Sequence, residues 1–133
     1  MMMKKCALAC ALALSLGVVG CSSWTEPVLT PSTTFSQIYS VADVRDAIFK
    51  ACQNRNWLVT ADEPGKISAN LIVRSHQVQV DIPYSATGYT INYVSSVNMK
   101  AGGGEIHNKY NNWVNNLDHD IRFNLQKTMA LKN

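Results

Sequence analysis

The sequence lacks an apolar run long enough to cross a bilayer. Its one long uncharged apolar stretch covers residues 6–19, 14 residues in all, whereas a membrane-spanning helix needs about 20. The basic residues Lys4 and Lys5 precede this stretch, and the small residue Gly20 follows it. A basic start, a short apolar run and a small residue at its end are typical of a secretory signal peptide. We therefore expect residues 1–20 to direct export rather than to form a membrane helix.

The sequence also lacks an excess of charge of one sign once the signal peptide is set aside. The whole chain has 12 basic and 9 acidic residues. Loss of Lys4 and Lys5 would leave 10 basic residues beside the 9 acidic ones. Nucleic-acid binding depends on clustered Lys and Arg that neutralise several phosphates. Because the mature chain has no such cluster in its sequence, we expect no nucleic acid as a partner.

Sequence motifs for common chemistries are missing as well. The chain has no G-x-S-x-G nucleophile elbow, and its three histidines do not have the H-x-x-x-H or H-E-x-x-H spacing of a zinc site. Residues 102–104 are a glycine triplet that lacks the Lys-Ser/Thr pair of a phosphate-binding loop. We therefore expect neither a metal site nor a cofactor, and we expect that the protein is not an enzyme.

Cysteine is scarce outside the amino-terminal segment. Of four cysteines, Cys6 and Cys10 lie within the expected signal peptide. Cys21 ends the sequence V-V-G-C at residues 18–21, which resembles the lipobox of bacterial lipoproteins. The resemblance implies cleavage after Gly20, a diacylglyceryl group on the Cys21 thiol and an acylated amino terminus. Two or more acyl chains anchor a protein stably, whereas one chain does not, so the membrane would be a partner through Cys21.

The residue after Cys21 bears on the final location of the protein. Ser22, rather than Asp, occupies this position, and in lipoproteins of Gram-negative bacteria this implies sorting to the periplasmic face of the outer membrane. A modified Cys21 leaves Cys52 without a disulfide partner, although an oxidising compartment would permit a disulfide. We expect Cys52 to be a small buried apolar residue; a reactive thiol is the alternative.

Composition divides the mature chain into two parts. Residues 21–39 are rich in Ser, Thr and Pro without an apolar period, so we expect the lipidated cysteine to be followed by a flexible tether. Trp24 in this segment would lie either at the membrane interface or in solvent. Residues 40–133 form the expected single domain, of a size that one hydrophobic core can stabilise.

Apolar periodicity within residues 40–133 predicts two helices around a set of strands. Apolar residues recur at helical spacing from Val41 to Cys52, after an N-terminal cap at Ser40, and again over residues 108–131. Between the helices, about four segments alternate with a period of two. We therefore predict an α+β fold, a two-layer sandwich of about four antiparallel strands with two helices on one face, in the order α-β-β-β-β-α.

The alternation also predicts how the strands pair. A two-residue loop at residues 74–75 would pair Val73 with His76 and would put the apolar residues of both strands on one face. An unbroken register in the next hairpin would place Val78 opposite Ser95. The turn around His76 would then lie beside the end of the last strand.

This pairing gathers polar residues at one edge of the sheet. Eight residues form our candidate binding edge: Arg74, His76, Ser96, Asn98, His107, Tyr110, Asn111 and Trp113. A corner whose hydrogen bonds only fix a hairpin against a loop is the alternative. Tyr110 and Trp113 also have the three-residue spacing of core residues on a helix.

A family resemblance covers most of residues 40–125. The segments R-S-H at 74–76, S-x-N-M-K at 96–100 and I-H-N-K-Y-N-N-W at 106–113 resemble a family of small proteobacterial lipoproteins with no assigned activity. Met99 stands where Leu is expected. The resemblance implies a fold and a location, but it implies no chemistry.

These observations predict a lipid-anchored envelope lipoprotein whose domain binds or scaffolds a partner, either another envelope protein or a glycan. The first alternative is a small periplasmic hydrolase or glycan-acting enzyme that uses His76 with Ser95 or Ser96. The second is a carrier that holds a lipid or small ligand between the sheet and the helices.

Overall fold

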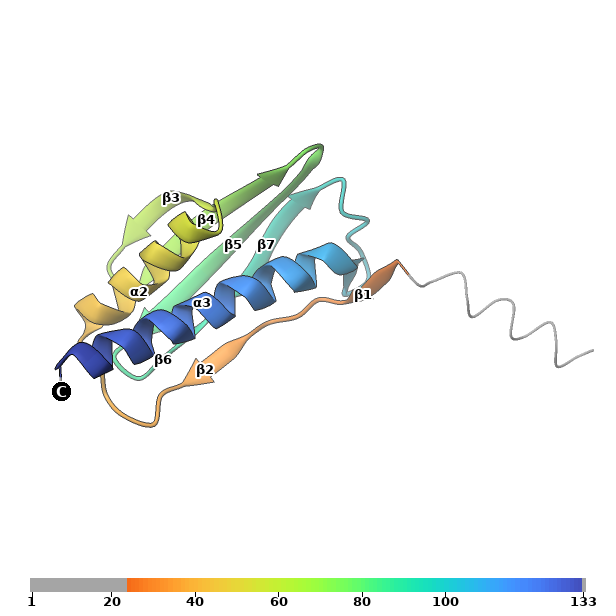
Figure 1. Cartoon of the computed structure of the whole chain (residues 1–133). Helices are drawn as coiled ribbons and strands as arrows, with labels where there is room; N and C mark the ends of the chain where they lie inside the picture. Colours follow the sequence, from red (N-terminus) through yellow and green to blue (C-terminus); the bar gives the residue numbers. More distant parts are fainter. Residues whose placement is uncertain (1–23, 133) are drawn as a thin grey trace, which may run out of the picture.

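Two helices lie on the same face of an antiparallel sheet (Figure 1). The structure is a computed structural model that describes residues 24–132, so the signal peptide and Cys21 lie outside the described residues. Helix α2 (Val41–Asn54) precedes the central strands and α3 (Asn108–Lys132) follows them. The predicted α+β fold is confirmed. The predicted count of about four strands is wrong, because residues 24–132 contain eight.

The main sheet has six strands in the order β2-β6-β5-β4-β3, with β7 also paired to β5. Its strands are β2 (Ser32–Thr34), β3 (Leu58–Glu63), β4 (Lys66–Val73), β5 (His76–Ser85), β6 (Gly88–Thr90) and β7 (Asn92–Val97). A separate pair joins β1 (Thr25–Pro27) to β8 (Glu105–His107). Strands β6 and β7 arise from one predicted strand, which is interrupted at Ile91, where the backbone N–H donates to Pro31 O at 2.9 Å.

The helices and the inner sheet face enclose one core. Helix α2 begins as predicted, because Ser40 Oγ accepts a hydrogen bond from the Asp43 N–H at 3.1 Å. Fully buried core side chains include Val44, Ile48, Ile67, Val80, Ile82, Leu117 and Ile121. Burial of an aliphatic side chain of this size contributes about 1.5–3 kcal/mol, so this layer supplies most of the stabilisation. The core fixes the sheet edges from which the candidate site is built.

The flexible tether predicted for residues 21–39 is wrong for the part that the structure describes. Thr25 pairs with His107 in the small sheet, and Ser32 pairs with Thr90 at the edge of the main sheet. Both strands are three residues long, which is too short for an apolar period to be visible in the sequence. Their backbone groups are satisfied by strands that come from much later in the chain, so the domain begins at Thr25 and not at residue 40.

The predicted pairing of β4 with β5 is confirmed. Val73 pairs with His76 across a two-residue turn at residues 74–75. Arg74 in this turn has a φ of 57°, in the left-handed region that residues other than glycine rarely adopt. The tight turn places Arg74 and His76 together at the end of the hairpin.

The predicted register of β7 is confirmed where Val80 pairs with Tyr93 and is wrong by one residue beyond that pair. Val78 of β5 pairs with Ser96 and not with Ser95. A β-bulge adds Val94 to β7 between its pairs with Gln79 and Val80. Because a shift of one residue reverses the face of a side chain, Ser96 lies on the helix side of the sheet and Ser95 on the opposite side.

Candidate functional site

The end of the β4–β5 hairpin is joined to the loop after β7. The His76 Nδ1 atom lies 2.7 Å from the Asn98 carbonyl oxygen, and Asn98 Nδ2 donates to Ser75 Oγ at 2.8 Å. A carbonyl can only accept, so Nδ1 of His76 carries the proton. The Nε2 atom of a neutral His76 is therefore left as an acceptor.

His107 reaches the same place from β8. Its backbone N–H donates to Met99 O at 2.8 Å, and its Nδ1 atom accepts from the Lys109 N–H at 3.2 Å. The neutral His107 ring therefore carries its proton on Nε2. Partial burial lowers the pKa of His107, and the positive charges of His76, Lys100 and Lys109 lower it further.

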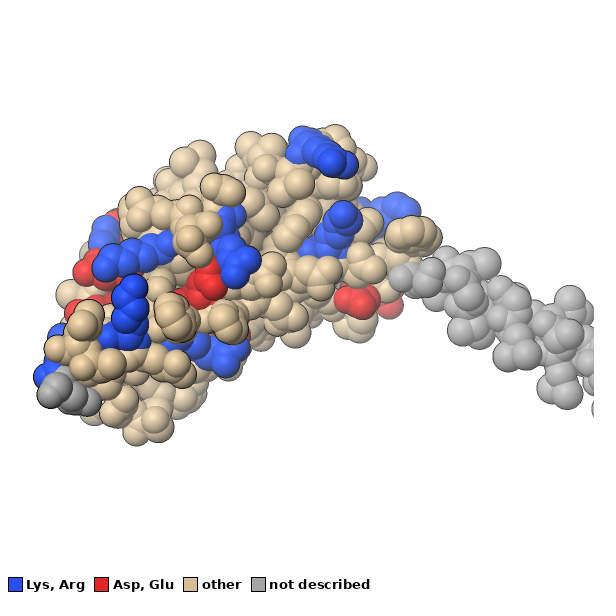
Figure 2. All heavy atoms as spheres, viewed as in Figure 1, with Lys and Arg blue, Asp and Glu red and all other residues tan. Residues whose placement is uncertain are grey.

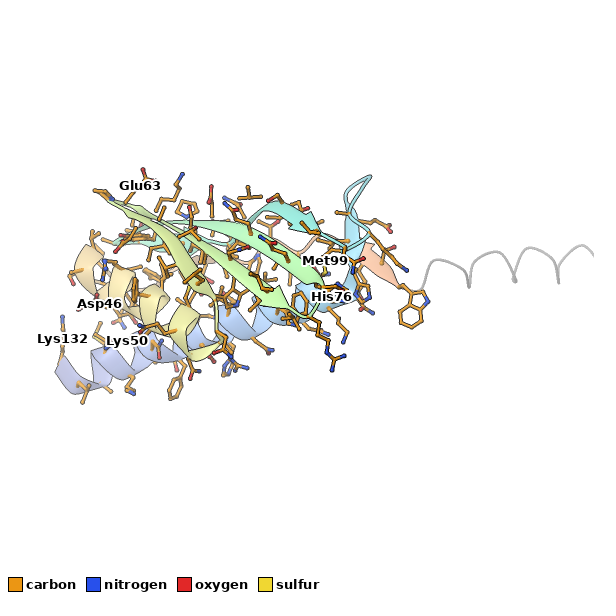
Figure 3. The ribbon with its side chains drawn as sticks, turned by 90° about the horizontal axis from the view of Figure 1, so that it is seen from above. Asp46, Lys50, Glu63, His76, Met99 and Lys132 are labelled. Carbon is orange, nitrogen blue, oxygen red and sulfur yellow. The ribbon has the colours of Figure 1, made fainter. Side chains whose placement is uncertain are left out.

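Four rings form a continuous cluster that we call the aromatic edge: Trp24, His76, His107 and Trp113. The ring centroids of His76 and His107 are 5.9 Å apart, those of His76 and Trp113 are 6.3 Å apart, and those of Trp24 and His107 are 6.4 Å apart. Figure 3 shows His76 and Met99 at one end of the molecule and Asp46 and Lys132 at the other. The edge offers an acceptor on His76 and a donor on His107 between two indole rings.

The structure does not bring either candidate serine to His76. Ser96 Oγ forms a hydrogen bond with the Tyr93 hydroxyl at 2.7 Å. Ser95 pairs with Gln79 on the sheet face opposite to His76. The contact of His76 Nδ1 is a carbonyl and not a carboxylate, whereas a catalytic triad uses a carboxylate to orient this atom. The arrangement supplies hydrogen-bonding groups without a placed nucleophile.

Tyr110 does not belong to the candidate edge, and this part of the prediction is wrong. Its side chain is 0% exposed, and its ring meets Tyr93 edge to face with centroids 5.5 Å apart. Burial raises the pKa of the Tyr110 hydroxyl. The three-residue spacing to Trp113 is the spacing of a helix face that is buried at Tyr110 and half-buried at Trp113.

Asn111 has a structural position at the edge. Its side chain binds the strand at the amino-terminal side of the domain, through hydrogen bonds to Glu26, Pro27 and Leu29. Arg74 is exposed at the hairpin turn. The predicted residues that lie together at the surface are therefore Arg74, His76, Asn98, His107 and Trp113.

Metal-binding and thiol chemistry find little support in the described residues. Between residues 24 and 132, no group of three or more His, Cys, Asp or Glu side chains could hold a metal ion together. Cys52 is a free, buried cysteine, and burial raises the pKa of its thiol to about 12. A thiol with such a pKa is protonated at neutral pH and is a poor nucleophile.

A second candidate surface is the side of the sheet that faces away from the helices. We call it the outer sheet face and define it by the following residues: Leu58, Asn70, Ile72, Gln77, Gln79, Asp81, Ser95 and Val97. Neighbouring strands place these side chains in rows, for example Ile72 beside Gln77 and Gln77 beside Val97. Leu58, Ile72 and Val97 are 65%, 63% and 58% exposed. The face therefore combines amides with exposed aliphatic side chains.

Sequence reasoning missed that Trp24 belongs to the aromatic edge and that Lys100 and Lys109 lie near it. Trp24 meets His107 across 83 positions of sequence, a contact that follows from the pairing of β1 with β8. No periodic pattern marks a three-residue strand, so nothing in the sequence shows this contact. Lys100 lies in a loop with a φ of 53°, and its proximity to His107 depends on how that loop folds back.

No protein-family model matches this chain, and no curated protein matches it. Within residues 24–132, no helix is both long enough and apolar enough to span a membrane.

Proposed function

We propose that the chain is an exported lipoprotein, held on the periplasmic face of the outer membrane of a Gram-negative bacterium by acyl groups on Cys21. The support lies in the sequence: a short apolar run after two lysines, followed by V-V-G-C and Ser22. We further propose that the folded domain is a binding or scaffolding domain and not an enzyme.

The proposal of a binding domain is based on the outer sheet face. Both helices cover the other face of the sheet (Figure 3), so the rows that contain Ile72, Gln77 and Val97 are open. Patches of exposed apolar side chains are typical of interaction sites, and here Ile72 and Val97 lie in one row on either side of Gln77.

The partner favoured by this composition is another envelope protein. Protein interfaces combine apolar and polar side chains, and the outer sheet face carries both. A glycan would instead use the indole rings of the aromatic edge, with His76 and His107 as polar contacts. Charged side chains are few on the outer sheet face, which has Asp81 at one end.

The two alternative functions have less support. The enzyme requires a serine beside His76, but Ser96 binds Tyr93 and Ser95 lies on the other face. The carrier requires a space between sheet and helices, where buried side chains such as Ile48, Ile82 and Leu117 pack instead. Labelling by a fluorophosphonate probe that is lost in Ser96→Ala would favour the enzyme and would contradict the binding proposal.

The lipid attachment is tested by mass spectrometry of the mature protein. We expect the amino-terminal peptide of the wild type to begin at Cys21 and to carry a diacylglyceryl group. The Cys21→Ser variant should lack this mass and should leave the membrane fraction. A wild-type peptide without acyl groups would overturn the proposed anchoring.

The binding surface is tested by photo-crosslinking in cells. A photoreactive amino acid at Gln79 lies in the middle of the outer sheet face, and the same amino acid at the exposed residue Gln126 on α3 is the matched control. We expect a discrete protein adduct from position 79 that is weaker in an Ile72→Asp background. Equal adducts from both positions, or none from position 79, would contradict the proposed surface.

A further inference from the structure

The structure fixes the point at which the chain from Cys21 enters the domain. The Trp24 carbonyl accepts a hydrogen bond from the Asn108 N–H at 3.0 Å, and Thr25 already pairs with His107. The domain is therefore attached from Trp24 onwards, three residues after Cys21. Three residues span at most about 11 Å even when fully extended.

This short connection limits how far the domain can lie from a bilayer. The inference rests on the proposed acylation of Cys21, which would hold that residue at the lipid surface. Trp24 would then lie within about 11 Å of the bilayer surface. A long tether would leave the domain free to turn, but a connection of this length selects the end of the domain that faces the lipid.

The end selected in this way has the composition of a lipid-contacting surface. Trp24 is 62% exposed, and Trp is enriched at membrane interfaces because its ring is amphipathic. Arg74, Lys100 and Lys109 are exposed at the same end. Figure 2 shows basic side chains on the half of the molecule from which the amino-terminal chain leaves, with acidic side chains near them, and other basic side chains toward the opposite end. Lys and Arg near an anionic lipid surface are attracted to its head groups.

Acidic side chains at this end are held by neighbours within the protein. Glu105 Oε1 accepts from Thr25 Oγ1 at 2.7 Å, and Glu26 Oε1 accepts from Asn111 Nδ2 at 3.1 Å. The lysines Lys100 and Lys109, by contrast, form no ion pair within residues 24–132. The basic groups are therefore available to phosphate groups outside the protein.

We propose that this anchor end, formed by Trp24, Arg74, Lys100 and Lys109, rests on the phospholipid head groups of the membrane that holds Cys21. Helix α3 starts at this end and runs to the opposite one (Figure 1). Its 25 residues correspond to about 37 Å. The anchored domain thus stands with the far end of α3 away from the bilayer, and the outer sheet face is presented sideways to partners in the periplasm.

The orientation is tested with the full lipidated chain in vesicles of phosphatidylethanolamine and phosphatidylglycerol. A bimane label is attached to Ala101→Cys in the loop beside Lys100, or to Gln126→Cys near the far end of α3; both positions are exposed. The buried Cys52 remains unlabelled, which the wild type verifies. With a spin-labelled lipid head group as quencher, we expect quenching at position 101 to be several-fold stronger than at position 126.

The contribution of the basic side chains is tested with two charge-matched pairs in the position 101 background. The first pair is Lys100→Asn with Lys109→Gln, in which Asn tolerates the positive φ at position 100. The second is Lys50→Gln with Lys127→Gln, at exposed sites away from the anchor end. We expect the first pair to reduce quenching about twofold or more, by loss of attraction to anionic lipid, and the second to leave it unchanged.

Three results would count against the proposal, and they differ in what else they overturn. Equal quenching at positions 101 and 126, in protein whose acyl groups are verified by mass spectrometry, would reject the orientation but leave the lipoprotein proposal intact. Equal effects of the two lysine pairs would reject the role of the basic groups in the same way. Absence of acyl groups on Cys21 would reject both proposals.

Discussion

Asn111 and Glu26 stand 85 positions apart in the sequence, and Asn111 Nδ2 donates a hydrogen bond to Glu26 Oε1 at 3.1 Å. The same nitrogen donates to Pro27 O at 3.0 Å, and Asn111 Oδ1 accepts from the Leu29 N–H at 3.0 Å. A single side chain in the first turn of α3 therefore holds residues 26–29, near the start of the domain. Without this contact, β1 would be joined to the domain mainly by its short pairing with β8.

Replacement of Asn111 by Ala should weaken this attachment. We expect the free energy of unfolding to fall by about 1–3 kcal/mol, because backbone groups of residues 27–29 lose their partners. Hydrogen exchange should become faster in the same residues. The matched control is Asn112→Ala, an exposed neighbour whose loss should change stability by no more than about 0.5 kcal/mol. Equal effects of the two substitutions in a denaturant titration would contradict the role of Asn111.

Gly88 should tolerate no side chain, because β2, the strand that the sequence did not reveal, lies directly against it. A Cβ atom at this position would lie 2.5 Å from the Thr33 carbonyl oxygen of β2. We expect Gly88→Ala to cost about 1–3 kcal/mol of stability through this overlap and to release β2, which proteolysis near residues 32–34 would detect. Gly102→Ala is the control, because no atom lies within 4 Å of its added Cβ. Unchanged protection of β2 in Gly88→Ala would show that the strand does not pair as described.

The sequence was informative where a buried face imposes an alternation. The pairing of Val73 with His76 and the two helices follow from apolar residues that must face one core, and the cap follows from the position of Ser40 before the first helix. The strands β1 and β2 could not be predicted, because they are three residues long and are rich in residues that are also typical of linkers. Their stability comes from partners at Thr90 and His107, which are distant in sequence.

The candidate site was also predicted only in part. His76 and Asn98 were brought together by the predicted hairpin, and the structure joins them by a hydrogen bond. The bulge at Val94 was not predictable, because the two consecutive serines after Val94 give no apolar alternation that would show which residue is unpaired. It decides which serine faces the helices, and so it removes Ser95 from the neighbourhood of His76.

The lowered pKa of His107 predicts a specific loss of stability in acid. Since the pKa of the folded form lies below the ordinary value of 6.5, the unfolded chain binds the proton first as the pH falls. The contribution of neutral His107 is therefore complete above pH 6.5 and is lost as the pH decreases through its folded pKa. We expect thermal unfolding of His107→Gln to change less than that of the wild type between about pH 7.5 and about pH 5. A His107→Gln variant with the full wild-type dependence would contradict the lowered pKa of His107.

Two buried tyrosines should respond in opposite ways to loss of the hydroxyl group. The Tyr89 hydroxyl donates to Asp118 Oδ1 at 2.6 Å, so Tyr89→Phe leaves this buried oxygen without that donor, while Arg122 still binds Asp118 Oδ2 at 3.2 Å. The loss should cost about 1.5–3 kcal/mol. The Tyr110 hydroxyl has no hydrogen-bond partner within residues 24–132, although water binds it in the unfolded chain. Its removal should relieve a desolvation cost of about 1–3 kcal/mol, offset in part by the small space left behind. We expect Tyr110→Phe to be neutral or more stable by up to about 1 kcal/mol in a denaturant titration. If Tyr110→Phe were as destabilising as Tyr89→Phe, the Tyr110 hydroxyl would have a partner in the folded protein, and its place in a purely apolar part of the core would have to be revised.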